Sequence, residues 1–355
     1  MADTAYTIER LAPLPVKVPP PRFGSATAAE LMDEVLPPIR YIVPGIFAEG
    51  LTLFGGKPKL GKSWFLLGTA IAVAMGGYAL GTIEVEQGDV LYLALEDNKR
   101  RLQKRLGQLL PTTACNIPVR LPERLHYDLN CRRLDDGGLD DIRAWIESRP
   151  DPRLVIVDVL NKVRPAMKGN EGIYDYDVRS LEGLQGLAAE FGIAIVVIHH
   201  TRKAEAEDPF DCLSGSTGLT GTADTTLVLA RDSQGTTLYG RGRDIEEIES
   251  ALTFDRTSGA WTMLGAAADV RRSDERNLIL DALRQSSEPM SPKDIMLAAG
   301  LESRNALDVT LYRMMKAGEI EKAGRGSYYL SGVHNPCKIG KNVRSGDRYG
   351  EGDAE

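Results

Sequence analysis

The chain has 355 residues, of which 26% are charged and 43% are hydrophobic, and its formal net charge is −7. These values are typical of a globular protein longer than one ordinary domain, and they argue against a protein coated in positive charge for non-specific nucleic-acid binding. No apolar run reaches membrane-spanning length, and the N-terminus is not typical of a signal peptide. The four cysteines lack C-x-x-C spacing, so we expect free thiols in a cytoplasmic protein that contacts no membrane.

Residues 1–40 are predicted to form an extended arm with one short helix. Prolines are frequent in the first part, and a helix is expected over Ala28–Val35, where Thr27 and Glu30 have capping-box spacing. The arm could pack on a neighbouring subunit, or it could be a disordered tail. The sequence leaves both possibilities open.

Residues 41–265 are predicted to form an α/β core. The expected strands are Leu51–Phe54, Val90–Ala94, Leu154–Asp158, Ile193–Ile198, Thr225–Ala230, Thr236–Tyr239 and Ala251–Phe254. The expected helices are Trp64–Met75, Asn98–Leu110, Leu139–Ser148 and Val178–Phe191. Strands rich in Val, Ile and Leu that alternate with amphipathic helices indicate a mixed, mainly parallel sheet covered on both faces. The closer spacing of the last strands predicts hairpins that extend one edge.

A small winged-helix-like domain is predicted over residues 272–332, after a linker at Ala266–Val270. Its expected elements are the helices Glu275–Gln285, Pro292–Ala298 and Arg304–Lys316 and a hairpin of Ile320–Lys322 with Ser327–Leu330. Its basic residues could bind duplex DNA or be ordinary solvated charges, and such domains also bind proteins: Arg304, Arg313, Lys316, Lys322 and Arg325. Residues 333–355 are predicted to be a disordered tail.

The most specific motif is a complete G-x-x-x-x-G-K-S phosphate-binding loop. It follows an apolar strand and opens a helix, which is the setting that the motif needs to cradle the phosphates of ATP. Lys62 is expected to reach the β- and γ-phosphates, and Ser63 to place its hydroxyl on Mg²⁺. The residues expected to contact the nucleotide are Gly56, Lys57, Pro58, Lys59, Leu60, Gly61, Lys62, Ser63 and Trp64.

Two acidic positions follow strands of the predicted core. Asp158 ends an apolar strand, as a second Mg²⁺ anchor does in a Walker B strand. Glu96 follows the strand between the phosphate loop and Asp158, where a carboxylate can orient and deprotonate the water that attacks the γ-phosphorus. Asp97 is the alternative base, and both carboxylates could instead serve as helix N-terminal charges.

Two further pairs of residues carry candidate roles. His199 and His200 end a buried strand, where an imidazole could sense the γ-phosphate; we favour His200, although a pair that merely caps the strand remains open. Arg241 and Arg243 are two positions apart after a late strand, so both side chains point the same way. They could reach a neighbouring subunit's transferring phosphate, or form surface ion pairs.

Taken in order along the chain, these motifs resemble those of the RepA-type ATPases. The resemblance rests on the phosphate loop, Leu95-Glu96-Asp97, Val157-Asp158, His199-His200-Thr201-Arg202-Lys203 and the Gly- and Thr-rich run from Leu213 to Asp224. It covers residues 41 to about 264. These proteins are RecA-like, ring-forming replicative helicases of plasmids and prophages, so the resemblance implies a RecA-like P-loop core, a hexameric ring with ATP between subunits and single-stranded DNA in its channel.

The resemblance also assigns roles to residues of this chain. Lys62 and Ser63 would bind phosphate and Mg²⁺, Glu96 would be the catalytic base and Asp158 the metal-side acid. His200 would be the sensor, and Arg243 the finger acting in a neighbouring subunit, with Arg241 beside it. The loops that line the channel would contribute Lys162, Arg164, Lys168, Arg202 and Lys203. The acidic residues Glu205, Glu207 and Asp208 depart from a phosphate-gripping second loop.

The leading hypothesis is an ATP-driven DNA helicase or single-strand translocase in plasmid or phage replication, with initiator or loader proteins as partners. The alternative is a RecA-like regulatory or repair ATPase that binds DNA or a protein without unwinding. A scaffold that binds nucleotide without turnover conflicts with the apparently complete set of catalytic residues.

Overall fold

The computed structural model describes residues 25–110, 112, 120–201, 208–213, 216–324 and 326–332. The predicted disordered tail lies outside these residues. The chain divides into two units, residues 1–38 and residues 39–355. Within the described part, no helix is both long and apolar enough to cross a membrane.

The first unit contains one described helix, α1 (Ala28–Asp33). Thr27 and Glu30 form the predicted capping box, with each side chain bonded to the other residue's backbone N–H. None of the residues of α1 is buried, and the side chains of Leu31 and Met32 are 55% and 84% exposed. Among the described residues of its unit, 25–38, the helix therefore has no apolar packing.

The second unit is built on a nine-stranded sheet with the strand order β13-β12-β11-β10-β3-β9-β8-β6-β7. Its strands are β3 (Gly50–Gly56), β6 (Asp89–Ala94), β7 (Leu125–Asp128), β8 (Pro152–Asp158), β9 (Ala194–His200), β10 (Thr225–Asp232), β11 (Gly235–Gly242), β12 (Ile248–Phe254) and β13 (Trp261–Ala266).

Six neighbouring strands run parallel, in the order β7, β6, β8, β9, β3 and β10. Beyond β10, the strands β11, β12 and β13 pair antiparallel and extend this edge of the sheet. The predicted α/β class, with its mixed and mainly parallel sheet, is confirmed, and so are the hairpins at one edge. The edge strands β7 and β13 were not predicted. Residues of β7 are half-buried or exposed, so this strand lacks the continuous apolar run by which buried parallel strands are recognised.

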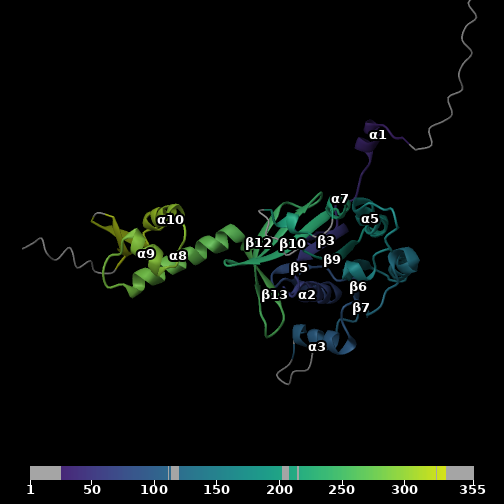
Figure 1. Cartoon of the computed structure of the whole chain (residues 1–355), viewed down its shortest axis with the longest axis horizontal. Helices are drawn as coiled ribbons and strands as arrows, with labels where there is room; N and C mark the ends of the chain where they lie inside the picture. Colours follow the sequence, from purple (N-terminus) through teal and green to yellow (C-terminus); the bar gives the residue numbers. More distant parts are fainter. Residues whose placement is uncertain are drawn as a thin grey trace, which may run out of the picture. The chain divides into compact units, whose positions relative to one another are not determined.

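Helices cover both faces of the sheet (Figure 1). On one face, α2 (Lys62–Met75) and α3 (Lys99–Leu109) pack in a cluster that includes Phe54 of β3. On the other face, α4 (Leu139–Glu147) and α6 (Glu182–Phe191) pack in a cluster that includes Leu53, the next residue of β3. The alternation of side chains along β3 thus separates the two cores.

The predicted helix Val178–Phe191 is two helices, α5 (Ile173–Arg179) and α6. The break falls at Ser180, whose hydroxyl donates to the carbonyl of Tyr176 at 2.6 Å. Such a bond lets a serine satisfy the backbone locally, which weakens the continuation of a helix.

The remaining elements of the second unit before its C-terminal part are short. They are β1 (Tyr41–Val43) paired with β2 (Phe47–Ala48), β4 (Gly77–Ala79) paired with β5 (Ile83–Val85), the π-helical turn η1 (Leu134–Gly138), the 3₁₀ turns η2 (Leu160–Lys162) and η3 (Pro209–Cys212), and α7 (Thr217–Thr222).

The C-terminal part contains the three predicted helices and the predicted hairpin. These are α8 (Ala267–Gln285), α9 (Pro292–Ala298), α10 (Arg304–Lys316), β14 (Ile320–Ala323) and β15 (Ser327–Leu330). They share a small apolar cluster of their own, with Ile279, Ile295 and Leu311 fully buried.

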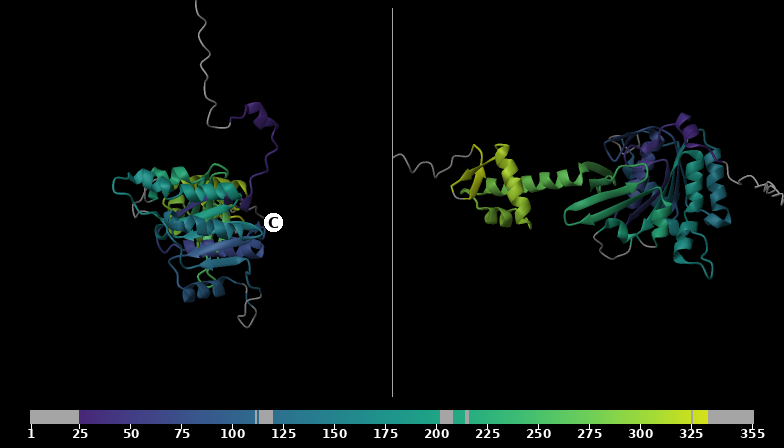
Figure 2. Two further views of the ribbon diagram at one scale, coloured as in Figure 1. Left: turned by 90° about the vertical axis from the view of Figure 1, so that its right-hand side faces the viewer. Right: turned by 90° about the horizontal axis from the view of Figure 1, so that it is seen from above.

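The predicted linker at residues 266–270 is wrong, because α8 begins at Ala267 and continues without a break (Figure 2). Ala267 is buried, and Arg271 lies 3.5 Å from a carboxylate oxygen of Glu249 on β12. These contacts with the sheet edge stabilise a helical start that the local sequence alone did not indicate.

Candidate nucleotide site

The phosphate loop joins β3 to α2, as its sequence predicts. Gly61 has φ +99°, and a Cβ there would lie 3.0 Å from the ring of Trp261. The indole N–H of Trp261 donates to the carbonyl of Gly61 at 3.1 Å. Glycine is therefore required by both the backbone angle and the close approach of Trp261. The loop is held from the far edge strand β13 as well as from its own strand and helix.

Lys62 is directed into the loop and is only 5% exposed. Its Nζ donates to the carbonyls of Gly56 at 2.6 Å and Lys57 at 3.1 Å. Burial lowers the pKa of Lys62 to about 8, and the nearby carboxylates of Asp158 and Glu96 oppose this shift. A phosphate chain would supply the negative charge that a buried ammonium group lacks.

Asp158 ends β8 beside the phosphate loop and is 4% exposed. The hydroxyl of Tyr92 donates to Asp158 Oδ2 at 2.7 Å, and the Ser63 side chain is also a hydrogen-bond partner. Burial raises the pKa of Asp158, while the bonds from Ser63 and Tyr92 oppose the rise. A hydroxyl and a carboxylate thus lie together, which is the protein contribution to a Mg²⁺ site completed by phosphate and water.

Glu96 and Asp97 have different surroundings. The Asp97 carboxylate forms ion pairs with Arg101 at 3.2 Å and with Arg105 at 2.5 Å, and its side chain is 5% exposed. Glu96 is exposed, and it lines the cavity beside Lys62. Of the two carboxylates left open by the sequence, the arginines engage Asp97, and Glu96 faces the cavity.

The two histidines at the end of β9 also differ. His200 pairs with Gly56 across the parallel strands, and its Nδ1 lies 3.5 Å from Lys62 Nζ. His199 is 4% exposed, and His200 is more accessible. Because neighbouring residues of a strand point to opposite faces, only His200 lines the cavity.

These residues surround a cavity of ≈ 350 Å³ at the carboxyl ends of β3, β8 and β9. Lys62, Ser63, Glu96, Asp158 and His200 all line it. The donor set fits Mg²⁺–ATP: an amine and a helix N-terminus for phosphate, and a hydroxyl and a carboxylate for the metal. Among the described residues, no cluster of three or more His, Cys, Asp or Glu side chains is placed to hold a metal without a ligand's help.

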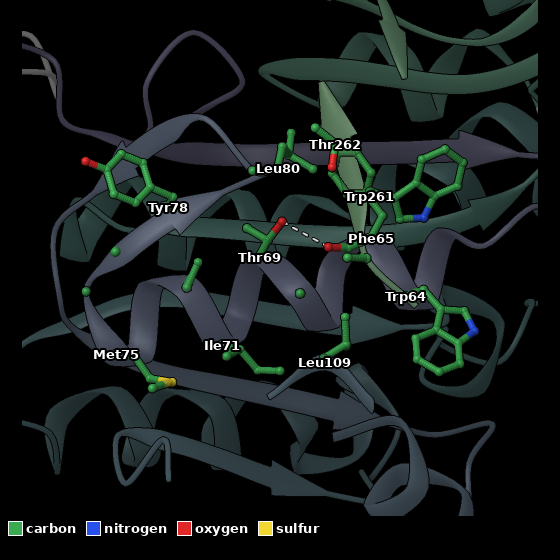
Figure 3. A pocket seen from close by; sticks show the side chains of 16 residues that line it. Trp64, Phe65, Thr69, Ile71, Met75, Tyr78, Leu80, Leu109, Trp261 and Thr262 are labelled. Carbon is green, nitrogen blue, oxygen red and sulfur yellow. Dashed lines mark hydrogen bonds between the residues drawn. The ribbon is translucent and has the colours of Figure 1, made fainter. Parts of the chain in front are cut away.

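A second cavity of ≈ 330 Å³ lies beside α2 (Figure 3). Its lining is mostly apolar and includes Phe65, Ile71, Met75, Leu80 and Trp261. None of its lining residues carries a carboxylate, amine, guanidinium or imidazole. The cavity at the phosphate loop is therefore the candidate nucleotide site.

Arg241 and Arg243 lie at the other end of the sheet. Gly242 of β11 pairs with Thr225, and Thr225 pairs with Thr52 near the start of β3, whereas the phosphate loop follows its end. Arg243 lies 3.0 Å from Asp224 and is 61% exposed. Neither arginine lines the nucleotide cavity of its own chain.

Arg241 forms surface ion pairs with Asp208 at 2.7 Å and Glu247 at 2.9 Å. Its guanidinium also lies over the ring of Phe210, 4.4 Å from the ring centroid. The surface ion pair that the sequence left open is therefore present for both arginines.

The basic residues predicted to line a DNA channel divide into three groups. Lys162 and Lys168 are exposed on the chain between β8 and α5. Arg164 is ion-paired with Asp177, donates to Ser180 Oγ at 3.0 Å and lies over the ring of Tyr176. Arg202 and Lys203 lie outside the described residues.

Arg164 therefore serves the packing of the loops within one chain. Its side chain is 13% exposed, and the side chain of its partner Asp177 is 2% exposed. Asp177 also accepts hydrogen bonds from the backbone N–H and the hydroxyl of Ser216, at 2.7 and 2.9 Å. This placement does not favour the predicted phosphate contact, because the guanidinium already neutralises a buried carboxylate.

Three residues of the site were not predicted from the sequence. Tyr92 supports Asp158, Trp261 supports Gly61, and Arg105 lines the nucleotide cavity while lying 5.5 Å from the ring of Trp64. A tyrosine inside an otherwise apolar strand was a usable signal, since a buried hydroxyl needs a partner. Nothing in the local sequence marks Arg105 or Trp261.

The order of the strands, the phosphate loop and the cavity beside it together define a RecA-like P-loop fold. The fold class that the sequence predicted is therefore confirmed. The sequence model of a family described as an AAA domain matches residues 17–206, more than half of the chain. The chain belongs to this AAA domain family. No protein with a curated description matches the sequence.

Two solved structures are similar to the chain. One is an ATPase domain, with a TM-score of 0.49 and 17% sequence identity over 61% of this chain and 85% of that one. The other is a DnaB-like replicative helicase described together with its interactions with primase, with a TM-score of 0.49 and 16% identity over 66% of each chain.

Replacing Arg164 with alanine should lower the free energy of unfolding by about 3–5 kcal/mol, because Asp177 would be left buried without its partner. Lys162→Ala, which removes an exposed charge from the same loop, should change it by no more than about 0.5 kcal/mol. Urea unfolding of both variants measures the difference. Equal stability of the two variants would contradict a packing role for Arg164.

Proposed function

We propose that the protein is an ATP hydrolase that acts as a DNA helicase or single-strand DNA translocase, of the RepA type, in plasmid or phage replication. The observation that carries the proposal is that the exposed residue Glu96 lines the same cavity as Lys62 and Asp158. A carboxylate in that position can accept a proton from water, which nucleotide binding alone does not require.

Different residues of the chain have different roles in the proposed hydrolysis. Lys62 and the N-terminus of α2 would hold the phosphates, and Ser63 and Asp158 would hold Mg²⁺, which when bound would neutralise charge on the phosphates. Glu96 orients the attacking water and accepts its proton, while Arg101 and Arg105 hold the carboxylate of Asp97 in ion pairs. His200 lies 3.5 Å from the Lys62 amine, so a change at the phosphates could pass into β9 and the loop after it.

A ring of subunits, with six as the expected number, would complete the site. Arg243 lies at the opposite end of the sheet from its own phosphate loop, is 61% exposed and could reach only another copy's nucleotide. In its ion pair with Asp224, the Arg243 side chain is 61% exposed and the Asp224 side chain is 17% exposed. If Arg243 moved to a phosphate, Asp224 would keep its hydrogen bonds from the backbone N–H of Leu51 and the side chain of Gln185.

DNA binding is proposed for the loops at the carboxyl ends of β8 and β9. Lys162 and Lys168 supply exposed positive charge, and the proposal extends to Arg202 and Lys203 on sequence grounds. Six copies of a few such charges would line a channel with positive potential even though the chain is net negative. Arg164 is left out of this set.

A second candidate function, a regulatory or repair ATPase that binds a protein partner, is favoured by the C-terminal elements. We propose that α8, α9, α10 and the hairpin form the winged-helix-like domain. Leu297 is 84% exposed, and Val309 and Tyr312 on α10 are 50% and 53% exposed. Apolar side chains on that helix suit a protein surface better than a phosphate backbone.

Steady-state ATP hydrolysis should be stimulated severalfold or more by a single-stranded oligonucleotide, since a translocase couples ATP hydrolysis to movement along the DNA strand. Purified protein is assayed with and without a poly(dT) strand, and a duplex of the same length is the control. Hydrolysis indifferent to DNA would favour the regulatory ATPase and would make the partner of the C-terminal elements the next question.

Glu96→Gln should reduce hydrolysis by about 10²–10⁴-fold while ATP binding is retained, because the amide cannot accept the proton of water. Asp97→Asn is the matched control, and it should retain far more activity. Turnover is measured by phosphate release and binding with a fluorescent ATP analogue. Comparable turnover in Glu96→Gln and the unsubstituted protein would exclude Glu96 as the base.

Arg243→Ala should be inactive alone, yet active when mixed with Lys62→Ala protein, because each variant would restore the half-site that the other lacks. Activity is followed across mixing ratios, with Arg241→Ala tested in parallel. An absence of rescue at every ratio would argue against a finger acting between subunits.

A further inference from the structure

The helix α3 carries a concentration of positive charge that the nucleotide site does not use. Five of its 11 residues are basic and none is acidic. Arg101 and Arg105 are paired with Asp97. Lys99, Arg100 and Lys104 are exposed, and among the described residues no carboxylate lies within ion-pairing distance of them. These three remaining cations, called the basic row below, are exposed, and Arg100 and Lys104 lie one turn apart on the same face of the helix.

This arrangement does not serve the stability of α3. The N-terminus of a helix carries partial positive charge, so lysine and arginine in the first turn are unfavourable there. Lys99, Arg100 and Arg101 fill that turn, and no basic residue occupies the last turn, where it would be favourable. The charges are thus placed where they weaken the helix, and only Arg101 has a carboxylate that compensates.

Two members of the basic row, Lys99 and Arg100, line a groove with an aromatic wall. The groove has a volume of ≈ 480 Å³ and is lined by Lys99, Arg100, Leu102, Gln103, Leu106 and Tyr127. Tyr127 belongs to the edge strand β7, and its side chain is 48% exposed. Cations that follow a groove, together with an exposed ring beside it, are the combination that binds single-stranded nucleic acid without sequence preference.

The groove is separate from the loops assigned to DNA above. Leu102 and Leu106 of α3 belong to the apolar cluster on the α2 face of the sheet. Leu160 and Val163, which flank Lys162, belong to the cluster on the opposite face. Figure 1 likewise places α3 on the side of α2 and α5 on the other side of the strands.

We infer that α3 and Tyr127 form a second binding surface for single-stranded nucleic acid. Lys99, Arg100 and Lys104 contact the phosphates, and Tyr127 stacks on a base. Lys99 and Lys104 are about 7.5 Å apart along the helix axis, so the row can meet more than one phosphate. The inference rests on the proposed function only in expecting that the chain encounters single strands; it requires neither ATP nor hydrolysis.

The test measures binding of a fluorescent poly(dT) strand to the full chain without nucleotide, by anisotropy over a series of salt concentrations. The triple variant Lys99→Gln, Arg100→Gln, Lys104→Gln should bind at least tenfold more weakly, and the slope of log K against log salt should decrease by about 2. The matched control removes three exposed, scattered arginines: Arg133→Gln, Arg231→Gln, Arg256→Gln. It has the same net charge and should retain most of the affinity.

Tyr127→Ala should weaken binding by about fivefold or more and leave the salt slope unchanged, because stacking does not release counterions. Thermal unfolding midpoints equal to that of the unsubstituted protein verify that the variants are folded. Affinity and salt slope of the α3 triple equal to those of the control triple would overturn the inference. Unchanged DNA binding with an altered oligomeric mass would also overturn it, since α3 would then contact another protein surface.

The failure of this inference can be told apart from that of the proposed function. A Lys162→Ala, Lys168→Ala double variant changes only the loops, and it should lose the stimulation of hydrolysis by DNA while the effect of the α3 triple on binding persists. If DNA never stimulates hydrolysis, the translocase proposal fails, and nucleotide-free binding at α3 still decides the second surface.

Discussion

The parallel pairing of β3, β9, β8 and β6 is the constraint on which the site depends. Parallel strands end at a common edge of the sheet, and this edge therefore receives the phosphate loop, His200, Asp158 and Glu96 from four separate stretches of sequence. Backbone hydrogen bonds set the register, so Gly56 lies beside His200 and Ala94 beside Asp158. Without this order, the same side chains would not share one cavity.

The site is further held by groups that the sequence did not predict to bind the nucleotide. Trp261 reaches the phosphate loop from the far antiparallel edge, and Tyr92 reaches Asp158 from the neighbouring strand. Arg101 and Arg105 engage the carboxylate of Asp97, whereas Glu96 lines the cavity beside Lys62. Which carboxylate lies open to the cavity thus depends on the ion pairs that neighbouring side chains form. Both arginines that pair with Asp97 belong to α3.

The distribution of positive charge matters more than the net charge of −7. Lys162 and Lys168 lie on the loop side that also holds α5, whereas the basic row of α3 lies on the α2 side. A strand of nucleic acid could therefore meet the protein at two places that the sheet separates. Arg164 carries the same charge but is committed to Asp177, so charge alone does not identify a binding residue.

The sequence by itself determined the strand and helix positions of the core, the phosphate loop and the acids at strand ends, because these depend on neighbouring residues and on periodicity. The split between α5 and α6 and the helical start at Ala267 depended on contacts that no periodicity records. Only the tertiary structure distinguished Glu96 from Asp97 and paired Arg164 with the buried Asp177. It did so because a side chain's role depends on its partners, and Trp261 is 200 residues from the glycine whose carbonyl it binds.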